Sequence, residues 1–130
     1  MVAMRGRKMW VGNMIFVFGS NLAGIHAGGA AKEAHDHFDA EWGVGTGPTG
    51  RAYAIPTMDR HLRPLPLDDI RGHVEDFKRY AAAHPRLEFF VTAVGCGIAG
   101  YRPDEIAPMF ADAPANCTLH RRLVEARSGA

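Results

Sequence analysis

Two glycine-rich stretches decide the fold of this chain: FGSNLAGIHAGGAA at residues 18–31 and TAVGCGIAGY at residues 92–101. Each follows a strand-like apolar run, residues 14–18 and residues 87–91, and each leads toward a helix-like segment. In an open α/β sheet, ligands bind at the loops that follow the carboxyl ends of the strands. Small residues there let backbone N–H groups approach a phosphate, and a helix N-terminus adds positive dipole. The pair predicts a ligand with two phosphates, or with a phosphate and a sugar.

The composition sets the outer limits. The 130 residues are enough for one domain with a hydrophobic core, and the 15 basic and 14 acidic side chains nearly balance. Nucleic acid is therefore a disfavoured partner, because its binders carry a clustered basic excess. The two short basic patches, residues 5–8 and 120–122, lie near the ends and are interpreted as solvated tails.

The same composition predicts where the protein resides. The apolar runs are shorter than a membrane span, and the first residues lack the apolar core and cleavage site of a signal peptide. The two cysteines, Cys96 and Cys117, have no metal-ligand spacing. We expect a cytoplasmic protein with reduced thiols, no membrane partner, no metal and no cofactor.

Strand-like and helix-like segments alternate along the chain. The predicted strands are residues 14–18, 52–55, 87–91 and 116–119, the second of them stopped by Pro56. The predicted helices follow apolar stripes over residues 30–38, 67–81 and 103–110, and long loops cover residues 39–50 and 57–66. This order predicts an α/β domain with a mixed, mostly parallel sheet. We divide the chain into an N-terminal extension (1–12), a domain (13–120) and a C-terminal tail (121–130).

The two glycine-rich loops resemble those of a macro domain, the ADP-ribose-binding module. The closer likeness is to the compact branch with terminal ADP-ribose protein glycohydrolase and the ADP-ribose-1″-phosphate phosphatases. It rests on AGGAA at residues 27–31 and VGCGI at residues 94–98, each followed by a helix. Residues 15–119 also resemble a family of small phage-associated non-structural proteins, to which we assign no activity. The resemblance implies a compact, macro-like three-layer domain whose sheet is flanked by helices.

The macro-domain resemblance also implies a ligand-binding set. Backbone amides of the second loop would cradle a phosphate and its ribose, and the first loop would close over the diphosphate. Ser20 or Asn21 would hydrogen-bond a ribose hydroxyl, Tyr101 would cover the distal ribose, and Phe18 would lie near the adenine. The full predicted set is Phe18, Ser20, Asn21, Gly28, Gly29, Ala30, Gly95, Cys96, Gly97, Ile98, Ala99, Gly100 and Tyr101.

The chain departs from the glycohydrolase at both catalytic positions. Ala99 stands where that branch has a catalytic aspartate, and residues 53–59 contain no lysine. A lysine Schiff-base mechanism therefore has no evident nucleophile. If the protein is an enzyme, His26 and Asp59 are the candidate catalytic groups, although a loop histidine without a role and a solvated carboxylate are the competing interpretations. Cys96 could be a nucleophile, but a buried, inert thiol is the favoured interpretation.

Three functional hypotheses remain open at this stage. The first is a non-catalytic reader or sink for ADP-ribose or a related adenine diphosphate nucleotide, with ADP-ribosylated protein as a further partner. The second is a hydrolase of an ADP-ribosyl bond, or an ADP-ribose-1″-phosphate phosphatase, that uses non-standard groups. The third is a structural or interaction protein in which the glycine loops are plain turns.

Overall fold

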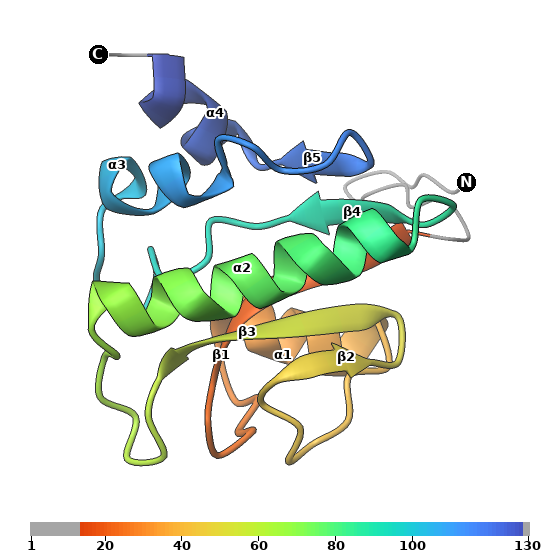
Figure 1. Ribbon diagram of the computed structural model, residues 1–130. Helices are drawn as coiled ribbons and strands as arrows, with labels where there is room; N and C mark the ends of the chain where they lie inside the picture. Colours follow the sequence, from red (N-terminus) through yellow and green to blue (C-terminus); the bar gives the residue numbers. More distant parts are fainter. Residues whose placement is uncertain (1–13, 129–130) are drawn as a thin grey trace, which may run out of the picture.

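The computed structural model describes residues 14–128, which form one five-stranded sheet between helices (Figure 1). The strands are β1 (Met14–Asn21), β2 (Gly47–Thr49), β3 (Ala52–Met58), β4 (Glu88–Val91) and β5 (Cys117–Leu119), in the order β2-β3-β1-β4-β5. β1 lies in the centre and is parallel to β3 and β4, β5 is parallel to β4, and β2 pairs antiparallel with β3. The predicted α/β class with a mixed, mostly parallel sheet is confirmed.

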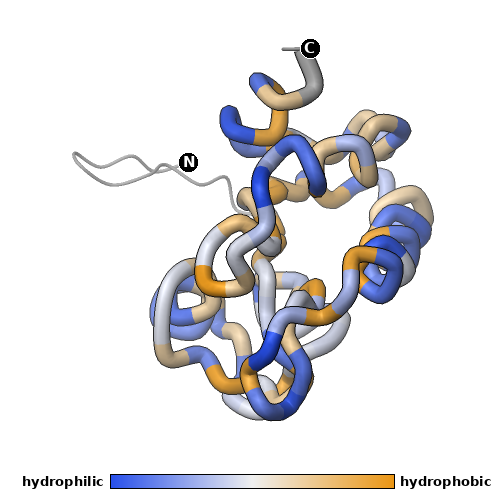
Figure 2. The backbone as a smooth tube through the Cα atoms, turned by 90° about the vertical axis from the view of Figure 1, so that its left-hand side faces the viewer, coloured by the Kyte–Doolittle hydropathy of each residue, from blue (hydrophilic) through white to orange (hydrophobic). Residues whose placement is uncertain are grey.

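Helices cover both faces of the sheet, so the domain has three layers (Figures 1 and 2). They are α1 (Gly29–His37), α2 (Leu67–Ala83), α3 (Pro103–Ile106) with the 3₁₀ turn η1 (Ala107–Phe110), and α4 (Arg121–Ser128). α1 packs on Phe16 and Phe18 of β1, while α2 packs on the opposite face around Val17. This alternation follows from the two-residue period of a strand. None of the helices within residues 14–128 is long and apolar enough to cross a membrane.

Strand β3 differs from its prediction at Pro56. The strand continues through this proline to Met58, and Pro56 pairs in register with Ser20 of β1. β2 accompanies β3 only as far as Ala54, so the other side of β3 needs no amide donor from Pro56. The predicted loop 39–50 contains β2, a three-residue edge strand whose sequence, Gly-Pro-Thr, lacks the alternation that signals a strand.

The C-terminal end of the described chain also differs from its sequence-based prediction. Residues 121–128, predicted as a solvated tail, form α4 because Leu123 is fully buried in the same cluster as residues of α2 and η1. α4 packs against α3 and η1 (Figure 1). The predicted N-terminal extension, including its basic patch at residues 5–8, lies outside the described residues.

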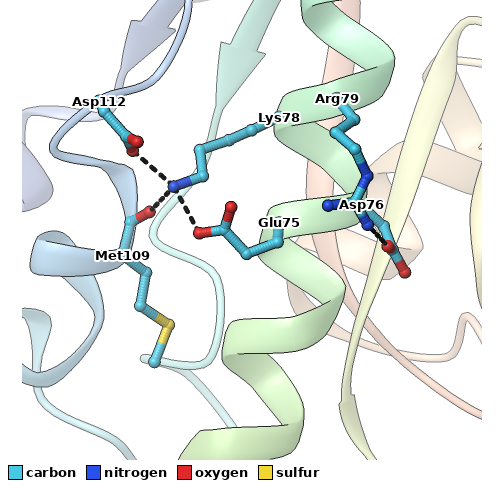
Figure 3. A network of polar contacts seen from close by, with 6 residues as sticks. All are labelled: Glu75, Asp76, Lys78, Arg79, Met109 and Asp112. Carbon is cyan, nitrogen blue, oxygen red and sulfur yellow. Dashed lines mark hydrogen bonds and ion pairs between the residues drawn. The ribbon is translucent and has the colours of Figure 1, made fainter.

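A buried lysine joins α2 to the segment that follows η1 (Figure 3). The ammonium of Lys78 donates to the Met109 carbonyl at 2.8 Å and to carboxylate oxygens of Glu75 at 2.7 Å and Asp112 at 2.6 Å. Burial opposes the charge of Lys78, but the hydrogen bonds to Asp112 and Glu75 outweigh it and raise the pKa of the lysine. The link fixes α2 relative to η1, which follows the second glycine loop.

Candidate functional site

The two glycine loops border one cleft of about 580 Å³ at the carboxyl ends of the parallel strands. Figure 2 looks onto this edge of the sheet, with α1 and α2 on opposite sides. Residues 27–31 form one wall, and residues 92–95 with 97–99 form another. The volume falls within the range of small-molecule sites, roughly 300–1,000 Å³. The sequence predicts a ligand site at the carboxyl ends of the strands, and the cleft lies at that edge of the sheet.

The first loop is held by a side chain at the end of β1. Asn21 brackets the backbone of Ile25: its Nδ2 donates to the Ile25 carbonyl at 2.9 Å, and the Ile25 N–H donates to its Oδ1 at 3.0 Å. α1 then begins at Gly29 with Gly28 as its N-cap, and no side chain caps it. The first N–H groups of a helix have no partner inside the helix. Those of α1, from Gly29 onward, therefore lie uncapped in the wall of the cleft.

The second loop presents a set of unbonded backbone donors. The N–H groups of Gly95, Gly97, Ile98 and Ala99 donate to no acceptor among residues 14–128. The N–H of Cys96, which was predicted to join them, donates instead to the Ala93 carbonyl at 3.1 Å. Unbonded amides at a concave surface are the arrangement that binds anions in backbone nests.

The two loops meet at the rim of the cleft. The Cδ1 atom of Ile98 lies 3.9 Å from the position that a Cβ atom would take on Gly28. The Ile98 side chain is 74% exposed, the largest exposed fraction among the large apolar residues described. Its apolar surface lies at the mouth of the cleft, where a bound molecule would touch it.

The structure brings eight members of the predicted ligand-binding set together. The cleft is lined by Asn21, Gly28, Gly29, Ala30, Gly95, Gly97, Ile98 and Ala99. Phe18, Ser20, Cys96, Gly100 and Tyr101 are not among its lining residues. Phe18 is fully buried under α1, and the Ser20 hydroxyl donates to the Gly45 carbonyl. The Tyr101 hydroxyl donates to the Leu65 carbonyl at 2.5 Å, so it stabilises the fold of this edge rather than covering a ligand.

Neither candidate catalytic group lines the cleft. His26 is 2% exposed, and its Nε2 donates to the Glu41 carbonyl at 3.0 Å. Its Nδ1 has no partner among the described residues, and its ring packs edge-on against Phe18. Asp59 accepts the N–H groups of His61 and Arg63 through one carboxylate oxygen, and the bond from Arg63 above all lowers its pKa. Both residues thus have local structural partners.

Sequence reasoning missed five aromatic or ionisable side chains of the cleft. Phe90 contributes aromatic surface, whereas Phe16 is almost fully buried against Phe38. Glu33 comes from α1, and Arg122 comes from α4. His120 also lines the cleft and packs edge-on against Phe90, with 6.3 Å between ring centroids. The sequence did carry a signal for His120 and Arg122. The basic patch 120–122 directly follows a predicted strand, and ligands bind at the loops that follow the carboxyl ends of strands.

The chemistry of the cleft offers few reactive groups. Burial raises the pKa of the Cys96 thiol, against a smaller lowering by the charge of Arg122, which favours the inert-thiol interpretation. Within residues 14–128, no group of three or more His, Cys, Asp or Glu side chains could hold a metal ion. The groups available to a ligand are backbone amides, the Phe90 ring, a guanidinium, an imidazole and a carboxylate.

Comparisons with protein-family models, with curated proteins and with solved structures found no match for this chain.

Proposed function

We propose that the cleft binds ADP-ribose or a closely related adenine diphosphate nucleotide, and that the protein acts as a reader or sink for it. The observation that carries this proposal is the convergence of unbonded backbone donors on one hollow. Four come from the second loop, and the uncapped N-terminus of α1 faces them from the first. A diphosphate supplies acceptors for both sets, because its oxygens form charge-assisted hydrogen bonds with N–H groups.

The remaining lining residues suit the rest of such a nucleotide. Phe90 is partly exposed and gives the cleft an aromatic surface against which a flat base can lie. Asn21 and Thr57 also line the cleft, but their side chains are almost fully buried and bonded to the backbone of Ile25 and Ser20, so a ribose would find its polar partners among the backbone amides of the two loops. The resemblance of the two loops to those of macro domains supports the same class of ligand.

Binding is favoured over hydrolysis by the placement of the titratable groups. His26 and Asp59 are engaged elsewhere, and Ala99 contributes no carboxylate to the second loop. A hydrolase working in this cleft would have to use Glu33 or His120, the two lining residues that could serve as general acid or base. Plain structural turns are also disfavoured, because Gly95 and Ala99 are buried residues with unbonded N–H groups, and buried amides are generally paired.

Titration calorimetry with ADP-ribose tests the proposal through two substitutions at one position. A Cβ atom on Gly97 would meet nothing within 4 Å, so both Gly97→Ala and Gly97→Glu are expected to fold normally. The alanine variant should bind as the parent does. The glutamate variant should lose measurable binding, because its side chain and charge occupy the phosphate position. Absence of binding by the parent at millimolar ADP-ribose, or full binding by Gly97→Glu, would overturn the proposal.

A further inference from the structure

Arg122 stands out among the charged residues of the cleft. It lies in the first turn of α4 and lines the same hollow as the glycine loops. Its backbone N–H donates to Nδ1 of His120 at 3.0 Å, but its guanidinium makes no ion pair or hydrogen bond with any residue of the described range 14–128. Its neighbour Arg121 is instead paired with Glu125 on the outside of the helix, with 3.6 Å between Nε and Oε2.

The fold fixes the backbone position from which the Arg122 side chain extends. Leu123 is fully buried and anchors the first turn of α4, and the N–H groups of Leu123 and Val124 donate to the His120 carbonyl. Burial raises the pKa of the Cys96 thiol, and the positive charge of Arg122 opposes that rise more than any other charged side chain acts on it. The charge of Arg122 therefore reaches the loop that carries the unbonded amides of Gly97 and Ile98.

We propose that Arg122 is a ligand-binding residue that selects for an anionic phosphate group, which it holds against the amides of the second loop. This inference rests on the proposed function for the identity of the nucleotide. It goes further in stating that Arg122 recognises the phosphate group of that nucleotide by its negative charge. Arginine suits the task, because its planar fork can donate two parallel hydrogen bonds to a phosphate. The amides supply direction, and the guanidinium supplies the positive charge that neutral amides lack.

The consequence is a defined ligand class. The cleft would take nucleotides whose phosphates reach the edge of the sheet beside α4, and it would discriminate against the corresponding neutral nucleosides. The residues predicted as a C-terminal tail would then form part of the site. Arg122 and His120 would contribute one rim, and Ile98 the mouth.

The test compares Arg122→Gln with Arg121→Gln, which removes the same charge one residue away. Both side chains are exposed, so both variants should melt at the parental temperature. Calorimetry measures ADP-ribose and adenosine, and phosphorus NMR measures inorganic pyrophosphate. Arg122→Gln should weaken ADP-ribose and pyrophosphate by about 10- to 100-fold, the usual range for a hydrogen bond to a charged group, and leave adenosine unchanged. Arg121→Gln should change none of them.

The outcomes separate the two proposals. If the parent binds ADP-ribose and the two variants bind it equally well, the role of Arg122 is overturned while the proposed function stands. If the parent does not bind ADP-ribose, the proposed function fails and pyrophosphate decides the role of Arg122. Pyrophosphate binding that is lost in Arg122→Gln alone would support an anion site, and no such loss would overturn it.

Discussion

Gly19 in β1 and Gly95 in the second glycine loop approach so closely that a Cβ atom on Gly19 would lie 3.2 Å from the Gly95 amide nitrogen. Gly95 itself has φ near +76°, a conformation that L side chains rarely adopt, and a Cβ there would lie 3.3 Å from Cδ1 of Ile106. The second wall of the cleft therefore rests on the central strand through backbone contact, and the two glycines make that contact possible.

We predict that Gly19→Ala destabilises the protein by about 1–3 kcal/mol, the usual cost of an added methyl group in a filled space. The neighbouring atom is a backbone nitrogen, which cannot move without displacing the loop that carries it. Urea unfolding followed by circular dichroism measures the change. Gly97→Ala is the matched control, because its new methyl group enters open space. Equal stability of the two variants would contradict the close approach.

Much of the fold could be predicted from the sequence, because its central elements carry strong local patterns. The continuous apolar run before the first loop predicts a strand buried on both faces, and β1 is the central strand. The apolar stripe of α2 and the His84-Pro85 stop give its extent within a few residues. β2 and the continuation of β3 through Pro56 could not be predicted. Both depend on which strand pairs with each side of β3, and the local sequence does not encode that pairing.

The candidate site also has a part that the local sequence predicts and a part that depends on the tertiary fold. Glycine loops after strands are a local signal, and eight residues of the predicted set do line one cleft. Phe90 could not be assigned, because its place depends on the order in which β4 joins the sheet, whereas Arg122 follows a strand in a basic patch that was interpreted as a solvated tail. Tyr101 lies in the predicted loop, but its hydroxyl is bonded to the Leu65 carbonyl, a partner 36 positions away in the sequence.

The Lys78 network predicts a specific dependence of stability on pH. Hydrogen bonding and charge from Lys78 lower the pKa of Asp112 below its ordinary 3.8, so this contribution is present above pH 4 and is lost as the pH falls further. Lys78 has a raised pKa, so its contribution is present below its ordinary 10.5 and is lost as the pH rises through the higher value of the folded state. The network should stabilise the fold most between these limits.

Lys78→Met should therefore cost about 1–3 kcal/mol near pH 7, because the Met109 carbonyl loses its donor. The difference from the parent should shrink below pH 4 as the carboxylates lose their charge. Urea unfolding at pH 3 and pH 7 measures it. Arg79→Met, which removes an exposed ion pair with Asp76, is the control and should cost about 0–1 kcal/mol. A cost of Lys78→Met that is the same at both pH values would contradict the role of the charges.

The last prediction uses Cys96 as a reporter of the charge on Arg122. Burial raises the pKa of the Cys96 thiol, and the positive charge of Arg122 opposes that rise. Since the thiolate is the reactive form, Arg122→Gln should slow alkylation of Cys96 by iodoacetamide at pH 8, and Arg121→Gln should not. Peptide mapping by mass spectrometry separates Cys96 from Cys117, whose pKa burial raises to about 11 and which should react slowly in every variant. Because salt screens exposed charges, the difference between the two variants should diminish in 1 M sodium chloride. Equal Cys96 rates at low salt would place the guanidinium away from the second loop.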